Sequence, residues 1–137
     1  MRYIDLHVHS NCSDGTFSPE ELVVLGIKQE LVAFALTDHD TISGVERAIK
    51  KAEEFDNKIQ VIPGMELSCK YLLSSSQSVE IHMLGYRYDI HNKKLIATLE
   101  DISNEREERN RKMCSNLQNA GFPISYDMLC ERFGDTI

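Results

Sequence analysis

Six side chains of metal-binding type follow one another within the first 82 residues: His7, His9, Asp14, His39, Glu66 and His82. Imidazole nitrogens and carboxylate oxygens bind Zn²⁺, Mn²⁺ and Fe²⁺. His7 and His9 stand two residues apart on an expected strand, so both rings project from one face, about 7 Å apart at the backbone. One cation at about 2.1 Å from each nitrogen can bridge them. The pattern predicts a metal site suited to hydrolysis.

The elements that would position these residues alternate between strand and helix. We expect strands over 2–6, 32–36 and 59–62, and helices over 19–28 and from Val45 to about Phe55. Ser18-Pro19-Glu20-Glu21 predicts a capping box with a proline at the first helical position, and Ser43-Gly44-Val45-Glu46 predicts a second box. Two consecutive βαβ units with right-handed crossovers would gather the carboxyl ends of the strands on one side of a sheet.

The remainder of the chain predicts a hairpin and two helices. The serine-rich tract 74–78 indicates a loop joining strands over 67–73 and 79–86. An apolar stripe from Leu95 to Leu117 predicts a long helix from about Asn92, ended by Gly121 and Pro123, with a short helix around 125–133. We therefore predict an α/β fold in two parts, residues 1–91 and a helical insertion at 92–137.

Composition narrows the class of protein. The 137 residues carry a net charge of −7, which disfavours tight sequence-independent binding to nucleic acid, although bound divalent ions would reverse the local field. No apolar run reaches the ~20 residues of a membrane span, and the start lacks the pattern of an export signal, so we expect a cytoplasmic protein. The four widely spaced cysteines indicate reduced thiols. A complete barrel takes about 250 residues, so we expect a fragment.

Each candidate has a structural alternative. Asp38-His39-Asp40 ends a buried strand, where carboxylates need partners or ions, but the same residues are common in turns. His82 lies in an apolar strand and is, alternatively, a core histidine bonded to a backbone carbonyl. Asp5 is expected to orient a ligand imidazole. Cys12 is interpreted as a filler and His91 as solvent-exposed.

Four ordered motifs resemble one known family, the polymerase and histidinol phosphatase (PHP) domain superfamily. They are Asp5-Leu6-His7-Val8-His9-Ser10 with Ser13-Asp14-Gly15, then Thr37-Asp38-His39-Asp40-Thr41, then Pro63-Gly64-Met65-Glu66, and then His82-Met83-Leu84-Gly85-Tyr86. The chain is most similar to the bacterial phosphoesterases of this family that include nucleoside 3′,5′-bisphosphate phosphatases and 5′-to-3′ exoribonucleases. The resemblance implies the N-terminal portion of a distorted (β/α)7 TIM-like barrel, followed by the start of a helical insertion.

The resemblance also implies a cluster of up to three divalent metals, Mn, Zn or Fe. His7, His9 and Glu66 would hold one ion, Glu66 and His82 a second, and Asp14 and His39 a third. The family's Gly-Arg-Pro-His stretch and its later Asp-x-His are absent from this sequence. We therefore expect fewer or weaker ions here than in the family.

The implied activity is metal-dependent hydrolysis of phosphate mono- or diesters of nucleotides or short RNA by a metal-bridging hydroxide. Asp38 and Asp40 are the expected catalytic carboxylates, either orienting His39 or assisting proton transfer, and His39, Arg106 and Arg109 are expected to bind substrate phosphate. One alternative is a small-molecule phosphatase of the histidinol-phosphate type. Another is a non-catalytic metal-binding half-domain that self-associates through exposed strand edges. We expect little or no turnover from residues 1–137 alone.

Overall fold

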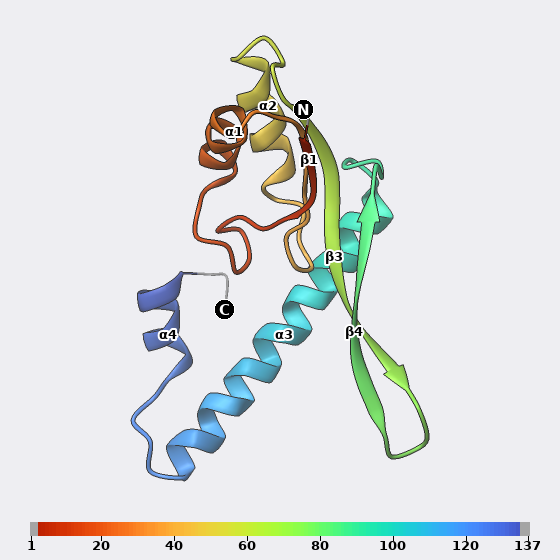
Figure 1. Cartoon of the computed structure of the whole chain (residues 1–137). Helices are drawn as coiled ribbons and strands as arrows, with labels where there is room; N and C mark the ends of the chain where they lie inside the picture. The colour runs from red at the N-terminus through yellow and green to blue at the C-terminus, as the bar shows by residue number, and fades with distance from the viewer. Residues whose placement is uncertain (1–2, 135–137) are drawn as a thin grey trace. The chain divides into compact units, whose positions relative to one another are not determined.

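The computed structural model describes residues 3–134, so the start of the first expected strand, at Arg2, lies outside the described residues. Contacts divide the chain into two compact units, Met1–His91 and Asn92–Ile137. The first unit contains β1 (Tyr3–Val8), α1 (Pro19–Lys28), β2 (Leu31–Leu36), α2 (Val45–Glu53), β3 (Gln60–Leu72) and β4 (Ser78–Tyr86), all coloured from red to green in Figure 1.

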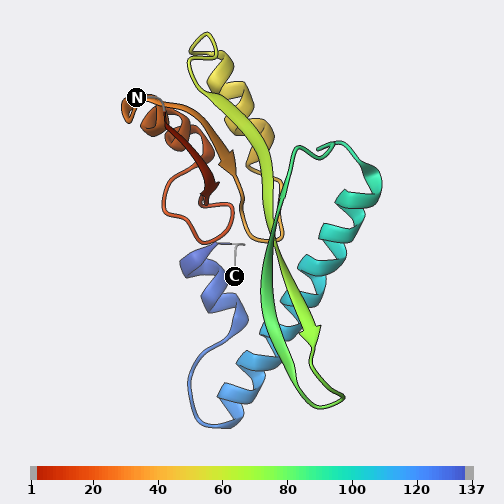
Figure 2. The ribbon, with the colours of Figure 1, turned by 45° about the vertical axis from the view of Figure 1, so that its right-hand side comes forward.

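The sheet of the first unit has the order β1-β2-β3-β4. β1 pairs with β2 and β2 with β3 in parallel, which gives the two expected βαβ units. β3 pairs with β4 in an antiparallel hairpin that extends beyond β1 and β2 (Figure 2). The carboxyl ends of β1 and β2 therefore meet beside the middle of β3.

The core of this unit lies between the two helices and the parallel strands. Val23 of α1, Val45 and Ala48 of α2, and Phe34 and Leu36 of β2 are each at most 1% exposed. The continuous apolar run of β2 is buried from Ala33 onward, as a strand covered on both faces must be.

The two helix starts differ from each other. α1 begins with the expected capping box, in which the Ser18 hydroxyl accepts from the Glu21 N–H and the Glu21 carboxylate accepts from the Ser18 N–H. The predicted box at Ser43 is wrong, because α2 has Gly44 as its N-cap without a side-chain bond. The Ser43 hydroxyl instead accepts from Thr41, 3.2 Å away. A Cβ at Gly44 would lie 2.9 Å from Pro19, so close helix packing selects glycine there.

The third strand corrects another expectation. We predicted that it would end at Ile62, but β3 runs without a break from Gln60 to Leu72. It pairs with β2 up to Pro63 and with β4 from Gly64 onward. Proline is compatible with this position because the strand changes partner there, and the Pro63 carbonyl accepts from the Arg87 N–H at 2.7 Å. Glu66 therefore lies within a strand and not at its end.

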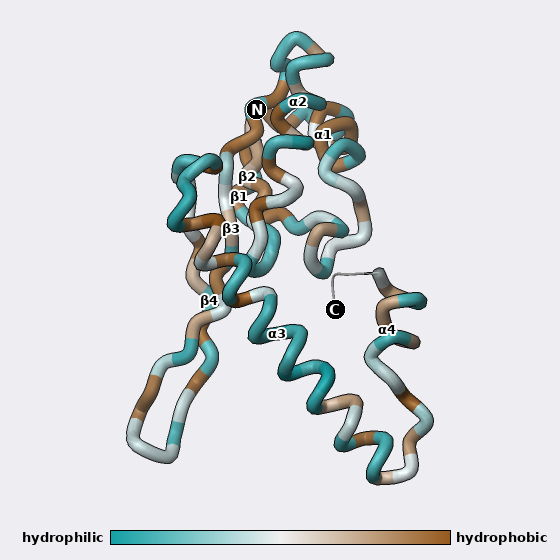
Figure 3. Tube along the Cα trace, turned by 180° about the vertical axis from the view of Figure 1, so that it is seen from behind, coloured by the Kyte–Doolittle hydropathy of each residue, from teal (hydrophilic) through white to brown (hydrophobic). Residues whose placement is uncertain are grey.

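The second unit is helical. α3 (Lys93–Asn119) starts at Asn92, whose side chain accepts from the N–H groups of Lys94 and Leu95, and α4 (Tyr126–Phe133) starts at Ser125 and ends at Gly134. The middle of α3 is mostly hydrophilic (Figure 3). Arg111 joins the two helices, with its guanidinium 4.2 Å from the Tyr126 ring centre. None of the described helices is long and apolar enough to cross a membrane.

Candidate metal centre

The six predicted metal ligands lie together at the point where β1, β2 and β3 approach one another. His7 is in β1 and His9 directly follows it, while His39 follows β2 by three residues. Glu66 is held beside His39 by the backbone, because the Glu66 N–H donates to the Asp38 carbonyl and the Asp40 N–H donates to the Glu66 carbonyl. The parallel strands and one long strand thus bring distant residues to a single place.

Glu66 lies at the middle of the cluster and is 6% exposed. Its Oε2 is 2.8 Å from Nε2 of His7, 2.9 Å from Nε2 of His9 and 3.7 Å from Nε2 of His39. Its Oε1 is 3.1 Å from Nδ1 of His82. The two carboxylate oxygens therefore face different histidines, which is the arrangement that lets one carboxylate bridge two cations.

Asp14 extends the cluster on the other side of His9. Its Oδ1 is 2.7 Å from Nδ1 of His9 and its Oδ2 is 3.7 Å from Nε2 of His39. The imidazoles form a continuous row, with ring centres 5.0 Å apart for His7 and His9, 4.7 Å for His9 and His39, and 4.9 Å for His39 and His82. The row therefore places several imidazole nitrogens within reach of a shared cation.

The ligand atoms form three groups, and within each group the atoms lie within 4.8 Å of one another. The groups are His7, His9 and Glu66; His9, Asp14 and His39; and His39, Glu66 and His82. Each group mixes imidazole nitrogen with carboxylate oxygen, the donor set of Zn²⁺, Mn²⁺ and Fe²⁺. The neighbouring Asp38 and Asp40 are 2% and 7% exposed. Together with Glu66 they make three buried carboxylates in this region. Buried negative charge of this kind is stabilised by cations, and the residues fit divalent metal.

The histidines also act on the carboxylates. Burial tends to raise the pKa of Glu66, but the hydrogen bond from His7 and the charges of His39, His7 and His9 outweigh it, so its pKa lies below the usual value. At Asp14, burial likewise tends to raise the pKa of the carboxyl, but the hydrogen bond and the charge of His9 act against it, so the pKa again lies below the usual value. Both side chains thus favour the deprotonated form that binds metal.

Asp38 and Asp40, the expected catalytic carboxylates, are bonded to the protein backbone and to serines. Asp38 accepts from the N–H and hydroxyl of Ser10 and the hydroxyl of Ser13, and Asp40 accepts from the N–H of Ser68. The buried Nδ1 of His39 has no hydrogen-bond partner among the described residues. The roles of Asp38 and Asp40 in orienting His39 or in assisting proton transfer stay predictions.

Other expected residues have different outcomes. His82 is not a core histidine bonded to a carbonyl, since its side chain is 41% exposed and contacts Glu66. Asp5 accepts from the backbone N–H of His7 and not from an imidazole. His91 is exposed, as expected. Cys12 is half-buried and lies 3.6 Å from a guanidinium nitrogen of Arg47.

Arg106 and Arg109 lie on α3, in the other compact unit. Arg106 is half-buried and Arg109 is exposed. Their role as phosphate clamps stays a prediction.

Sequence reasoning did not assign a role to Ser10 and Ser13. Ser10 is fully buried and both hydroxyls donate to Asp38. A serine directly follows the second histidine and another directly precedes Asp14, but no local pattern indicates their contact with Asp38.

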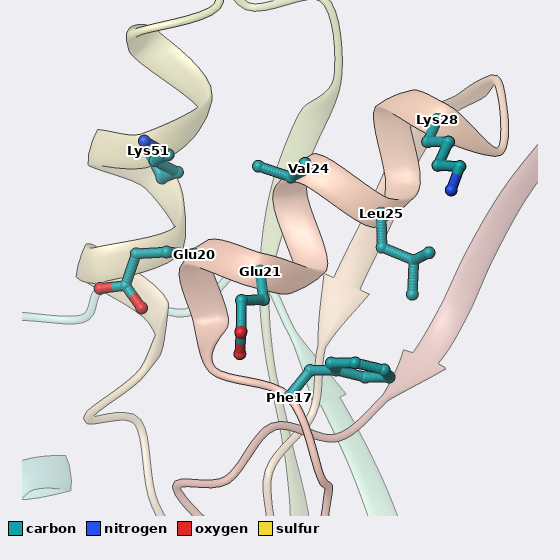
Figure 4. A pocket seen from close by; sticks show the side chains of 7 residues that line it. All are labelled: Phe17, Glu20, Glu21, Val24, Leu25, Lys28 and Lys51. Carbon is teal, nitrogen blue, oxygen red and sulfur yellow. The ribbon is translucent and has the colours of Figure 1, made fainter.

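A separate cavity of about 330 Å³ lies along α1 (Figure 4). It is lined by seven residues of α1, α2 and the loop before α1: Phe17, Glu20, Glu21, Val24, Leu25, Lys28 and Lys51. It includes none of the six predicted ligands, so the cavity and the metal centre are different features.

Comparison with known sequences gives one family and several named relatives. A family profile described as PHP domain matches residues 5–126. The chain is 37% identical over 123 residues to a 5′-3′ exoribonuclease of Haemophilus influenzae, covering 90% of the chain and 42% of that protein. It is 32% identical over 127 residues to a 3′,5′-nucleoside bisphosphate phosphatase of Chromobacterium violaceum, covering 93% and 42%. The chain thus spans less than half the length of these relatives.

Two solved structures match nearly the whole chain. An amidohydrolase from Chromobacterium violaceum, solved with bound sulfate and without metal, has a TM-score of 0.81 at 31% identity over 98% of the chain and 45% of that protein. A protein from Bifidobacterium adolescentis, provisionally described as a metal-dependent phosphoesterase, has a TM-score of 0.78 at 30% identity over 95% and 43%. The α/β fold is accordingly the N-terminal portion of a distorted (β/α)7 TIM-like barrel.

Proposed function

The chain belongs to the PHP domain family, and from this premise we propose that it carries the metal-binding part of a phosphoesterase that acts on nucleotides or short RNA. The relatives named above are an exoribonuclease and a nucleoside bisphosphate phosphatase, so both cleave phosphate esters of nucleotides. Because the chain covers 42% of each, the proposal concerns the activity of the full-length protein.

One observation carries the proposal: four imidazoles and two carboxylates lie together in a single cluster. They belong to His7, His9, His39, His82, Asp14 and Glu66. Glu66 belongs to two of the three ligand groups, and so do His9 and His39. Ligands shared in this way hold ions close together, as in enzymes that use two metals to displace a leaving group from phosphorus. A structural site would need only a single closed set of four ligands.

When bound, the ions would lower the pKa of a coordinated water and neutralise negative charge on the phosphoryl oxygens. The chain's own residues hold and orient these ions. Glu66 presents one oxygen to His7 and His9 and the other to His82, and Asp14 faces His9 and His39. We also propose that His39 contacts a substrate phosphate. We propose that Arg106 and Arg109 bind a phosphate of the substrate through charge-assisted hydrogen bonds.

We also propose that this chain associates with a second copy of itself. Tyr3, Ile4 and Leu6 of the edge strand β1 are 55%, 58% and 43% exposed. A second apolar surface lies on one face of the β3–β4 hairpin, where Tyr71 pairs with Val79 and both are largely exposed. Edge strands with exposed apolar side chains pair readily with other strands.

The experiment for the enzymatic proposal uses the full-length protein loaded with Mn²⁺ or Zn²⁺. Release of phosphate from a nucleoside 3′,5′-bisphosphate, or of nucleotides from a short 5′-phosphorylated RNA, supports the proposal. Release from histidinol phosphate alone would favour the small-molecule alternative. Absence of hydrolysis of all three by a protein with bound metal would overturn it.

Metal binding and turnover are also tested with the 137-residue chain by itself. Elemental analysis of residues 1–137 should find divalent metal, whereas turnover by this chain is expected to be little or none. Robust hydrolysis by the purified chain would contradict that expectation.

A further inference from the structure

We propose that Asp38 and Asp40, on either side of His39, are positioning residues that each support a different part of the metal centre. Asp38 would hold the loop 10–14, which carries Asp14, and Asp40 would hold β3 at the place where His82 is paired. The inference deepens the proposed function and rests on it, because it concerns the ligands of the same ions.

Asp38 is tied to the loop by three hydrogen bonds. Its Oδ1 accepts from the Ser10 N–H at 2.6 Å and from the Ser13 hydroxyl at 2.7 Å, and its Oδ2 accepts from the Ser10 hydroxyl at 2.7 Å. Ser10 directly follows the ligand His9, and Ser13 directly precedes the ligand Asp14. The carboxylate therefore fixes the chain at one side of each of these two ligands.

Bonds within the loop give it its shape. The Ser10 carbonyl accepts from the N–H groups of Ser13 and Gly15, at 3.1 and 2.9 Å, and the Ser10 hydroxyl accepts from the Cys12 N–H at 3.1 Å. These bonds close a tight turn, whereas the bonds to Asp38 attach the turn to the end of β2. Loss of the carboxylate should leave a turn that is formed but less firmly placed.

Asp40 is tied to the opposite side of the centre. Its Oδ1 accepts from the Ser68 N–H at 2.8 Å, and Ser68 is the direct cross-strand partner of His82 and lies two residues after Glu66. Ser68 and Glu66 are on the same face of β3, since side chains alternate along a strand. The bond from Asp40 therefore fixes the segment that presents Glu66 and His82.

The backbone at Asp40 sets the choice of variants. Its φ is 52°, a left-handed conformation that Asp, Asn and Gly adopt more readily than other residues. Asp40→Asn keeps an oxygen acceptor for Ser68 and tolerates this φ, whereas Asp40→Gly tolerates the φ and removes the acceptor. Asp38→Asn leaves one oxygen facing three donors, because the amide nitrogen can only donate.

Two measurements on the 137-residue chain test the proposal. In the metal-free chain, amide hydrogen exchange is followed at Ser10 and Ser68. Asp38→Asn should speed exchange at Ser10 at least about tenfold and leave Ser68 unchanged. Asp40→Gly should do the reverse, and Asp40→Asn should resemble the wild type at both amides.

The second measurement follows Co²⁺ binding by the shifts that the paramagnetic ion induces in NMR signals. Asp38→Asn should weaken the Co²⁺ response of the Asp14 amide roughly 10–100-fold in affinity and spare that of the His82 ring. Asp40→Gly should weaken the response of His82 and spare that of Asp14, with Asp40→Asn restoring it.

A second pair of variants, at Ser13, covers the case in which Asp38→Asn does not fold. Ser13→Ala removes one donor to Asp38 and Ser13→Thr keeps it. Because the same hydroxyl also lies 3.3 Å from Oδ1 of Asp14, the two variants are compared by amide exchange at Ser10, which only the alanine variant should speed. Equal effects of both Ser13 variants, or equal losses at Asp14 and His82 in either aspartate variant, overturn the proposal. A wild-type chain without any Co²⁺ response contradicts the proposed function, while amide exchange still decides how the carboxylates position the chain.

Discussion

Glu66 and His39 are neighbours through their backbones as well as their side chains. The Glu66 N–H donates to the carbonyl before His39, and the Glu66 carbonyl accepts from the N–H after it, at 3.2 and 3.0 Å. Nε2 of His39 lies 3.7 Å from Oε2 of Glu66. The position of one ligand relative to the other is therefore set by main-chain hydrogen bonds and does not depend on side-chain flexibility.

Removing ligands should have graded effects. Glu66→Ala and His9→Ala each affect two ligand groups and His7→Ala affects one, so the first two should lose more bound metal. We expect a loss of more than about tenfold in kcat/KM of the full-length protein for Glu66→Ala and His9→Ala. Elemental analysis and phosphate release measure the two effects. Lys50→Ala, which removes an exposed ion pair with Glu46, is the control. A loss of less than tenfold in Glu66→Ala counts against the assignment.

Gly15→Ala should disturb the loop beside the metal centre. A Cβ at Gly15 would lie 2.3 Å from the His9 carbonyl oxygen, so the loop must shift and Asp14 with it. We expect weaker metal binding, measured by titration calorimetry, and a lower melting temperature. Gly85→Ala is the matched control, because its Cβ would meet Met65 at an ordinary 3.9 Å. Equal metal affinity in both variants would be inconsistent with the close packing of this loop.

The ion pair between Glu20 and Arg47 should make stability depend on pH. Arg47 donates to both oxygens of Glu20 at 2.8 Å, and this hydrogen bond holds the pKa of Glu20 below its ordinary 4.5. A lowered pKa means that the contribution is complete above about pH 4.5 and is lost as the pH falls through the folded-state value.

Glu20→Gln tests this dependence. It should lower the free energy of unfolding at pH 7 by less than about 1 kcal/mol, because the pair is partly exposed to solvent. It should also reduce the pH dependence below 4.5, which urea unfolding at several pH values measures. Arg47→Gln should give the same change. A pH dependence identical to that of the wild type in both variants would show that the pair contributes nothing.

Self-association should depend on the exposed face of β1. Ile4→Lys places a charge on the edge strand, which discourages pairing with a second copy. We expect the dimer fraction to fall at a given concentration, measured by light scattering. Val24→Lys is the control, since Val24 is similarly exposed, at 45%, but lies on α1. A monomeric wild type at all concentrations would refute the proposed dimer.

Arg106 and Arg109 should distinguish substrates by size. If they bind phosphate, Arg106→Ala and Arg109→Ala should reduce hydrolysis of short RNA in the full-length protein more than about tenfold, because charge-assisted bonds to phosphate are strong. Lys112→Ala is the control, since Lys112 lies on the same helix and makes an exposed pair with Glu108 at 2.7 Å. Unchanged hydrolysis of RNA in both variants would favour a smaller substrate.

The sequence was sufficient to predict which residues would meet, but not what holds them. His7, His9 and His39 lie in or shortly after predicted strands, and parallel strands joined by helical crossovers place their carboxyl ends at the same edge of the sheet. The roles of Ser10 and Ser13 could not be predicted in the same way. They depend on how a loop closes around Asp38, 28 residues from Ser10, and local patterns do not contain that information.

The two errors in secondary structure have similar causes. Pro63 and Gly64 are typical of a turn, but in the structure they lie where β3 changes its partner from β2 to β4. Ser43 has the right spacing for an N-cap, but Gly44 is the N-cap of α2 in the structure. The short distance to Pro19 leaves no room for a Cβ at Gly44. In both cases packing against a distant part of the chain outweighed a local preference.

The unbroken course of β3 limits how the length of this protein can change. One residue inserted or deleted between Gly64 and Glu66 would turn Glu66 to the opposite face of the hairpin, and one between Glu66 and Ser68 would do the same to Ser68, because side chains alternate with a period of two. The tip of the hairpin at 73–77 is free of this restriction, since no predicted ligand lies there. We therefore expect homologous proteins to differ in length at the tip, while the spacing from Pro63 to Ser68 stays constant.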